Sequence, residues 1–310
     1  MKDTILYGDC RQTLPAFIDK ARMCVTSPPY YGLRDYGGED KQIGQEDTPE
    51  EYIQTLVEVF RKVRDCLTDD GTLWVNIGDT YYNYRSDGNY PKQTVARTNQ
   101  DLPSFSPARG NKLEGLKSKD LIGIPWMLAF ALRADGWYLR QDIIWHKPNP
   151  MPESVKDRCT KSHEYIFLLS KNKKYYYDHE SIKEPAVGER WGGNKPINMN
   201  NTKDTTGQFS GLTRPRKMVY EKRNKRSVWK VTTKPYKGSH FAVFPEELIT
   251  PCVLAGSEKN DIILDPFMGS GTTAMVAKKL GRYYLGCELH RDYSNLIEER
   301  LPNDSLSKLL

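Results

Sequence analysis

Residues 262–273 have the sequence IILDPFMGSGTT, and this stretch decides the fold class. Ile262-Ile263-Leu264 is a short apolar run typical of a buried strand, and it delivers Asp265 to the strand's carboxyl end. The glycines of Gly269-Ser270-Gly271 allow a tight turn and a close approach of the backbone to a ligand. Thr272 and Thr273 then open a helix. A strand, a glycine turn and a helix in succession are typical of an open α/β sheet, whose ligands bind at the carboxyl ends of its strands.

The same alternation of strands and helices extends along the 310 residues of the chain. Apolar residues spaced three and four apart predict a helix over 49–67, and further helices are expected over 121–134, 272–280 and 291–301. Strands are expected over 4–7, 23–25, 73–77, 138–145, 165–169, 262–264 and 283–287. The alternation predicts an α/β, Rossmann-like fold, in which a mostly parallel sheet carries helices on both faces.

Two stretches interrupt this alternation. Residues 84–118 are rich in Ser, Asn, Gly, Pro and charged residues, and residues 184–235 are similar and more basic. Irregular stretches of this length are usually functional or disordered. For 184–235 we expect a surface that closes around a polymer, and for 84–118 the two interpretations stay open.

Positive charge is concentrated in one region of a chain whose net charge is only +6. Residues 211–240 hold ten Lys or Arg and a single acid, Glu221, and Tyr220, Trp229 and Tyr236 lie among them. A charge run alone is as typical of a solvated face as of a binding surface. Basic residues interleaved with aromatic ones suit a phosphate backbone and unstacked bases, so the region favours nucleic acid as a partner.

Cysteine, histidine and hydropathy patterns weigh against several other classes. The six cysteines are scattered without a C-x-x-C pair, so neither a zinc site nor a disulfide framework is expected, and several have apolar neighbours typical of a core. His146, His163 and His240 have no metal-ligand spacing. No apolar run approaches the ~20 residues that cross a bilayer, and the N-terminus lacks the apolar core of a signal peptide.

The glycine turn after Asp265 differs from the loops that bind phosphate. It lacks the G-x-G-x-x-G pattern, and no lysine follows it as in a P-loop. The expected strand 283–287 ends at Glu288, about 20 residues further on, where a carboxylate can accept hydrogen bonds from both hydroxyls of a ribose. A lone Gly-Ser-Gly is more often a simple turn, whereas the full stretch with Glu288 behind it predicts a nucleoside cofactor without phosphate.

A second motif, Thr26-Ser27-Pro28-Pro29-Tyr30, follows the expected strand 23–25 and suits transfer to a planar exocyclic amine. The lone pair of such a nitrogen is delocalised into the ring, so an enzyme must accept both N–H groups and hold the nitrogen about 3 Å from the donor carbon. The Ser27 hydroxyl and the Pro28 carbonyl can be the two acceptors, while the two prolines, Pro28 and Pro29, stiffen the turn. Tyr30 can stack on a base that has been flipped out of the duplex. Alone, the motif is equally typical of a Pro-Pro turn with a core tyrosine.

Together the two motifs resemble those of the DNA amino-methyltransferases, in the permuted N4-cytosine/N6-adenine family whose catalytic half precedes the cofactor half. Segments 73–81, 124–126, 136–148 and 163–167 continue the resemblance, which covers most of the chain. It implies the class I methyltransferase fold, circularly permuted, with a seven-stranded, mostly parallel sheet, an antiparallel hairpin at one edge and a basic target-recognition insertion. It also implies S-adenosyl-L-methionine as the cofactor and a reaction that needs no metal.

The resemblance assigns cofactor contacts to residues at the ends of expected strands and in the loops that follow them. The methionine part is held by the loop of Gly269, Ser270, Gly271, Thr272 and Thr273, with Asp265 nearby and Phe244 in a segment that covers it. Phe267 packs against the adenosine, Asp9 contacts the adenine, and Glu288 contacts the ribose. The catalytic residues implied are Ser27, Pro28, Pro29 and Tyr30, and Asp79 is expected to help shape their site.

The resemblance also divides the chain by function. Residues 1–170 are expected to form the catalytic half with a loop insertion at 84–118, residues 171–240 the target-recognition region, and residues 241–310 the cofactor half. The expected partner is double-stranded DNA, approached from the major groove, where base identity can be read. The residues expected to contact DNA are Arg34, directly after the catalytic turn, and Arg214, Arg216, Lys217, Arg223, Lys225 and Arg226.

Serine at position 27 favours cytosine N4 as the methylated atom, because family members that act on adenine N6 mostly carry Asp or Asn there. Adenine N6 stays the alternative, and RNA or protein could replace DNA as the substrate of the same fold. An alternative of another class is a DNA-binding protein without turnover, against which the intact Ser27, Tyr30, Asp265 and Glu288 argue. We expect a cytoplasmic protein encoded by a bacterium, an archaeon or a phage. A separate cognate restriction endonuclease, and a monomer or a homodimer, are left open.

Overall fold

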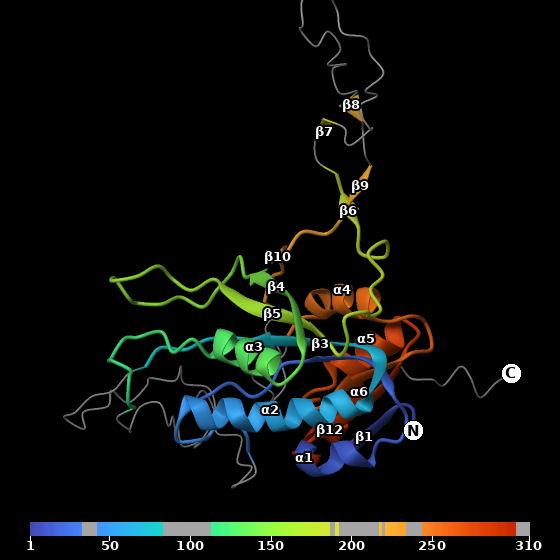
Figure 1. The fold of residues 1–310 in the computed structure, drawn as a ribbon, viewed down its shortest axis with the longest axis horizontal. Coiled ribbons are helices and arrows are strands. Elements are labelled where there is room, and N and C mark those ends of the chain that lie inside the picture. The colour runs from blue at the N-terminus through green and yellow to red at the C-terminus, as the bar shows by residue number, and fades with distance from the viewer. Residues whose placement is uncertain are drawn as a thin grey trace, which may run out of the picture. The chain divides into compact units, whose positions relative to one another are not determined.

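The computed structural model describes residues 1–32, 42–82, 113–186, 190–191, 217–218, 221–233 and 244–301 (Figure 1), with the backbone alone at 190–191 and 217–218. The chain divides into two compact units. The larger comprises Met1–Asp178 with Arg226–Leu310, and the smaller is His179–Lys225. The smaller unit falls within the predicted target-recognition region 171–240, while the assignment of functions to the three predicted parts stays a prediction.

An eight-stranded sheet forms the centre of the larger unit, in the order β1-β12-β11-β2-β3-β5-β4-β10. Its strand β5 runs antiparallel to both neighbours, and the other described pairs are parallel, so the mostly parallel sheet and the β4–β5 hairpin are confirmed. The strands are β1 (Thr4–Tyr7), β2 (Ala21–Thr26), β3 (Leu67–Ile77), β4 (Tyr138–His146), β5 (His163–Ser170), β10 (Val228–Lys230), β11 (Ile262–Asp265) and β12 (Tyr283–Glu288).

The predicted number of seven strands is wrong, because β10 adds an eighth at the edge beside β4. For the same reason the β4–β5 hairpin does not form the edge of the sheet, where it was expected. Trp229 lies opposite Trp145 in this parallel pair and is buried, while its neighbours Val228 and Lys230 are exposed. The ladder is continued by Ile144 N, which donates to Ser227 O at 2.8 Å. Three residues inside a run of charged side chains carry too little periodicity to predict a strand.

Helices cover both faces of the sheet, as predicted. Successive side chains of β3 contact the helices of one face and of the other in turn, because side chains of a strand point alternately to opposite faces of the sheet. Leu73 and Val75 belong to the apolar cluster formed with α2 (Pro49–Cys66) and α3 (Ile124–Ala134). Trp74, between them, lies on the other face against α4 (Glu246–Gly256), where a Cβ on Gly256 would come within 3.1 Å of the indole nitrogen.

Several helices begin at or near the positions that the sequence indicates. Thr48 and Glu51 form a capping box at the start of α2, each side chain accepting from the other's backbone N–H. The predicted helix 121–134 begins at Ile124, and the predicted helix 291–301 is a 3-10 turn, η4 (Arg291–Tyr293), followed by α6 (Ser294–Arg300). The other elements are α1 (Cys10–Thr13), η1 (Leu14–Ala16) and α5 (Thr272–Lys279).

The smaller unit contains two antiparallel ladders in a stretch where no regular structure was predicted. The strand β6 (Glu184–Pro185) pairs with β9 (Lys222–Arg223), and β7 (Arg190–Trp191) pairs with β8 (Lys217–Met218). Each strand has two residues. Such short pairings join segments far apart in the sequence, so no local pattern announces them.

Candidate active site

Both sequence motifs lie at the same edge of the sheet. Asp265 ends β11 and Glu288 ends β12, while Ser27 follows β2 and Asp9 follows β1 with one residue between. Because these strands are parallel neighbours, their carboxyl ends meet at one edge, which is where ligands bind in open α/β sheets.

The carboxylate of Asp265 joins the two motifs. Its Oδ1 accepts hydrogen bonds from Thr26 Oγ1 at 2.6 Å and from Phe267 N at 3.0 Å, and its Oδ2 accepts from Thr273 Oγ1 at 2.6 Å. Asp265 is 1% exposed, and this burial raises the pKa of its carboxyl to about 6, although the three hydrogen bonds lower it. The side chain therefore ties the catalytic strand to the cofactor loop, with both oxygens engaged by the protein.

The loop after Asp265 is shaped by two glycines and by Glu288. Gly269 and Gly271 have φ values of 53° and 81°, a region that favours glycine. Glu288 Oε2 accepts from Gly269 N at 2.7 Å and Oε1 from His290 N at 2.9 Å. Burial raises the pKa of the Glu288 carboxyl to about 7. Two hydrogen bonds thus fix the Glu288 carboxylate beside Gly269 of the loop.

The polar groups of this loop fit S-adenosylmethionine. Thr272 Oγ1 is buried and has no hydrogen-bond partner in the described part of the chain, so it can bind the carboxylate of a methionine moiety. Glu288 provides the carboxylate expected to hold ribose hydroxyls, and the half-buried Phe267 provides an apolar surface. The hydroxyl and the carbonyl of Ser270 both accept from Arg300 Nη1, and its predicted cofactor contact stays a prediction.

Two other predicted cofactor residues have defined surroundings. Asp9 is 9% exposed, caps α1 by accepting from Arg11 N, and pairs with the Arg11 guanidinium at 2.8 Å. An adenine at Asp9 would have to share this carboxylate with Arg11. Phe244 is half-buried and precedes α4, the helix expected to cover the methionine end.

The catalytic turn is anchored through one proline carbonyl. Tyr52 of α2 donates from its hydroxyl to Pro29 O at 2.7 Å. Pro28 is buried, and Ser27 is half-buried with its side chain hydrogen-bonded to Tyr30. The anchor uses a carbonyl other than that of Pro28, so it does not compete for the two acceptors predicted for an amino group.

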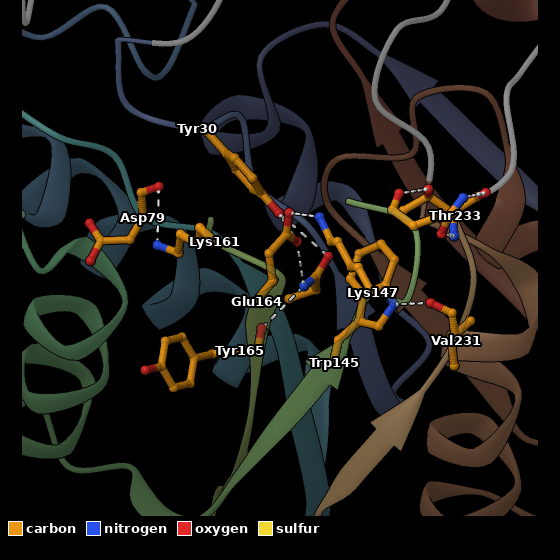
Figure 2. A network of polar contacts seen from close by, with 11 residues as sticks. Tyr30, Asp79, Trp145, Lys147, Lys161, Glu164, Tyr165, Val231 and Thr233 are labelled. Carbon is orange, nitrogen blue, oxygen red and sulfur yellow. Dashed lines mark hydrogen bonds and ion pairs between the residues drawn. The ribbon is translucent and has the colours of Figure 1, made fainter. Parts of the chain in front are cut away.

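Tyr30 ends in a polar network that the sequence analysis did not predict. Its hydroxyl donates to Glu164 Oε2 at 2.7 Å (Figure 2), and Asn76 Nδ2 donates to the same oxygen at 3.1 Å. Lys147 forms an ion pair with Glu164 Oε1. Charged residues beside the apolar runs of β4 and β5 were the available signal, but the sequence could not say that they reach Tyr30.

Asp79 caps a helix, and its predicted part in shaping the catalytic site stays a prediction. Its Oδ1 accepts from Gly123 N at 3.0 Å and from Ile124 N at 3.2 Å, so it caps the start of α3. Lys161 donates to Asp79 O at 3.3 Å (Figure 2). Asp79 thereby joins the start of α3 to the end of β3, where Gly78 contacts the Tyr30 ring.

The predicted DNA contacts are only partly described. Arg34, Arg214, Arg216 and most of the insertion 84–118 lie outside the described residues, and Lys217 is described by its backbone alone, in β8. Arg223 Nε pairs with Glu184 Oε1 at 2.9 Å across β9 and β6. Lys225 is half-buried, and Arg226 is exposed at the start of the returning segment of the larger unit.

The described residues contain no group of three or more His, Cys, Asp or Glu side chains that could hold a metal ion. His163 packs edge-on against the ring of Tyr165. In the same part of the chain, no helix is both long enough and apolar enough to cross a membrane.

This chain matches a family model and several known methyltransferases. The family model described as DNA methylase matches residues 21–299. The type II methyltransferase M.SmaI of Serratia marcescens is 49% identical over 298 residues, which cover 96% of this chain and 90% of that protein. M.Cfr9I of Citrobacter freundii, also a type II methyltransferase, is 46% identical and covers 97% of this chain and 88% of its own length.

Solved structures show the same fold at lower identity. The PvuII DNA methyltransferase (cytosine-N4-specific) has a TM-score of 0.63 at 17% identity, covering 98% of this chain and 88% of that one. TTHA0409 of Thermus thermophilus, solved with S-adenosyl-L-methionine, has a TM-score of 0.58 at 22% identity and covers 96% and 94%. The class I methyltransferase fold is thereby confirmed.

Proposed function

This chain belongs to the DNA methylase family of S-adenosylmethionine-dependent N4/N6 amino-methyltransferases, and we propose that it methylates N4 of cytosine within a specific sequence of duplex DNA. One observation carries the proposal: Thr26 Oγ1 donates to Asp265 Oδ1 at 2.6 Å, which ties the serine-type catalytic turn to the cofactor loop. A flipped amino group at Ser27 would therefore lie beside the cofactor's methyl donor. Serine at this position, typical of cytosine-N4 members, supports cytosine over adenine.

The chain's own residues bind and orient the target base in this proposal. The cofactor supplies an electrophilic methyl carbon when it is bound. The Ser27 hydroxyl and the Pro28 carbonyl accept the two N–H groups of the amine and favour a pyramidal nitrogen, and Tyr30 stacks on the ring. The base must leave the duplex before it can reach this turn.

The region that recognises DNA is proposed to be 171–240, with the described part of the smaller unit at its centre. Arg223 and Lys225 lie in the smaller unit, and Arg226 opens the segment that leads to β10, the strand that pairs with β4 of the catalytic half. Residues 1–170 and 241–310 then act as the catalytic and cofactor halves of one domain. Arg34 and the remaining predicted contacts stay part of the same proposal.

The proposal is tested by the nucleosides of DNA from cells that express the chain. Complete digestion and mass spectrometry should show N4-methylcytosine, absent from the same host with an empty vector. N6-methyladenine alone would overturn the choice of cytosine. An unmodified digest after confirmed soluble expression would overturn DNA methylation itself.

The Ser27→Ala variant tests the role of the serine. Turnover should fall by about 100-fold or more, the usual effect of removing a hydrogen-bonding group that acts at the reacting atoms. Cofactor affinity, measured by calorimetric titration, should stay close to that of the wild type because Ser27 lies outside the loop 269–273. An equal loss of cofactor binding would show that Ser27 supports the fold of the site and does not accept the amine.

A further inference from the structure

We propose that Glu164 is a positioning residue, which with Lys147 and Asn76 fixes the hydroxyl end of Tyr30 and so the plane on which the target base stacks. The inference rests on the proposed function, in which Tyr30 is the stacking surface. It adds a role for three residues that reach the site from β3, β5 and the end of β4.

Glu164 is bound on both carboxylate oxygens, and each partner comes from a different segment. Oε2 accepts from Tyr30 Oη at 2.7 Å and from Asn76 Nδ2 at 3.1 Å, and Oε1 pairs with Lys147 Nζ. Asn76 is itself oriented, because its Nδ2 also donates to Tyr165 O at 3.1 Å. Figure 2 shows the side chains of Tyr30 and Lys147 converging on Glu164.

Lys147 is held from a second side. Its Nζ lies 4.2 Å from the centre of the Trp145 ring, and Trp145 Nε1 donates to Val231 O at 2.8 Å. Asn149, two residues further on, exchanges hydrogen bonds of 3.0 Å with Thr233. The segment that follows β10 thus braces the lysine that pairs with Glu164.

The ring of Tyr30 is restrained by packing as well. A Cβ on Gly78 would lie 2.8 Å from Tyr30 Cε2, so the ring edge contacts the backbone at the end of β3. Burial, and then the Glu164 carboxylate, hold the pKa of the Tyr30 hydroxyl well above its ordinary value, which keeps it a hydrogen-bond donor. The ring is therefore fixed along its edge and at its hydroxyl.

A purely structural ion pair is a poor account of this cluster. The side chains of Lys147 and Glu164 are only 19% and 15% exposed, and taking two charges out of water costs about as much as their attraction returns. An apolar pair could join β4 to β5 as well. A carboxylate, in contrast, can bind a phenol, an amide and an ammonium group at once, which places Tyr30 in one direction.

The test is a double-mutant cycle of Glu164→Gln and Tyr30→Phe, measured as total methyl transfer to DNA. Each single variant should lower kcat, by up to about 100-fold for a misplacement near 1 Å. The two together should lose less than the product of the two single losses, because Tyr30→Phe removes and Glu164→Gln weakens the same contact. Fluorescence of 2-aminopurine at the target position should rise less on binding Glu164→Gln, while cofactor affinity stays unchanged.

Asp3→Asn is the matched control. Asp3 pairs with Lys278 at 3.0 Å with comparable exposure, 28% and 21%, but it precedes β1 at the opposite edge of the sheet. Its loss should leave kcat and the fluorescence signal at wild-type values. An equal effect of Asp3→Asn would mean that any lost ion pair slows the enzyme, and would overturn the proposal.

Other outcomes separate the inference from the function. Losses that multiply across the cycle would overturn the positioning role while leaving the methyltransferase intact. If Glu164→Gln fails to fold, Tyr30→Phe decides alone: unchanged kcat in that variant would overturn the inference. A folded wild-type protein without any methyl transfer to DNA would overturn the proposed function, and the inference with it.

Discussion

Asp265 is used by the protein itself, although its place at a strand end is typical of a ligand contact. Its two oxygens accept three hydrogen bonds, from Thr26, Phe267 and Thr273, and its exposure is 1%. A buried carboxylate is costly unless such bonds satisfy it. The charge therefore stabilises one arrangement of the loop and links that arrangement to the end of β2.

Thr26→Val tests this link at the scale of a single hydroxyl. Thr26 is fully buried, so valine preserves shape while it removes the 2.6 Å hydrogen bond to Asp265. The free energy of unfolding should fall by about 1.5–3 kcal/mol, the usual value for a hydrogen bond to a charged group. Urea unfolding measures the loss, and cofactor affinity and turnover should fall together. A stable variant with normal turnover would show that the two motifs are not coupled through this contact.

Glu288 predicts opposite pH dependences for stability and cofactor binding. Its pKa is raised from 4.5 to about 7 in the ligand-free fold, so the folded chain binds more protons than the unfolded chain between these values. Its contribution to stability is complete below pH 4.5 and is lost as the pH rises through about 7. The ribose hydroxyls of the cofactor require the ionised Glu288 carboxylate as acceptor. The affinity for the cofactor should therefore drop about tenfold for each pH unit below 7.

Calorimetric titrations of S-adenosylmethionine between pH 6 and 8 check the second effect. Glu288→Gln should bind more weakly throughout but lose this part of the pH dependence. The amine of the cofactor titrates equally with both proteins, so the difference between the two curves reports Glu288. Parallel curves for the wild type and the variant would contradict the assignment.

At the scale of elements, long apolar and periodic segments could be predicted and short pairings could not. The helix over 49–67 and the strands that end at Asp265 and Glu288 carry their own signals, namely spacing, capping residues and a glycine turn. The strand β10 is stabilised by β4, some 80 positions earlier in the chain, so its three residues show no pattern of their own. Contacts between distant segments have no local signature.

The candidate site likewise contains residues that the sequence predicts and residues that it does not. Ser27, Asp265 and Glu288 could be found because each directly follows or ends an apolar strand, and parallel strands bring such ends together. Glu164 and Lys147 could be seen as charges beside apolar runs, but their contact with Tyr30 depends on the register of β4 and β5. Register follows from side-chain packing across the sheet, which a single sequence does not display.

The strand β10 yields a prediction about the sheet edge. Trp229→Ala should destabilise the fold by up to about 3–5 kcal/mol, because the indole is 5% exposed and its Nε1 donates to Arg226 O at 2.7 Å. Release of β10 should expose the amide of Ile144, which donates to Ser227 O. Hydrogen exchange at Ile144 measures this.

Val228→Ala is the control for Trp229→Ala. Val228 lies in the same strand and is 61% exposed, so its truncation should leave both stability and the exchange of Ile144 nearly unchanged. If the two variants behaved alike, or if Ile144 stayed protected in Trp229→Ala, β10 would not hold the sheet edge through the indole.

At the scale of the whole molecule, the placement of charge matters more than its sum. A net charge of +6 on 310 residues is modest, and 46 basic residues are set against 40 acidic ones. Each phosphate contact releases a counterion and steepens the fall of affinity with salt. If DNA binds one localised basic surface, the salt dependence of its affinity should therefore depend on which charges are removed. If a diffuse excess of charge attracts the DNA, only the number of charges removed should matter.

Two triple variants distinguish these cases. Replacing Arg223, Lys225 and Arg226 by Gln lowers the net charge from +6 to +3. Replacing Lys2, Lys20 and Lys259 by Gln has the same effect on net charge, and these lysines precede β1, β2 and β11 at the edge of the sheet opposite to Ser27 and Glu288. In the first variant, the slope of log affinity for duplex DNA against log salt should become less steep by about 0.9 for each phosphate that the protein no longer neutralises. The effect includes breaking the ion pair of Arg223 with Glu184, which a phosphate would also have to displace.

Anisotropy titrations between 50 and 200 mM salt give both slopes, because over this range the affinity of a protein that neutralises six to ten phosphates falls by about 10³–10⁵. The second variant should keep the wild-type slope, because at a distance beyond the Debye length of about 10 Å the charges it removes are screened from the DNA. Equal slopes in the two variants would mean that total charge attracts the DNA. If the slope of log affinity against log salt became less steep only in the second variant, the DNA would lie at the amino ends of the strands, away from Ser27 and Glu288. The predicted pattern requires the phosphates to lie along the segment that precedes β10.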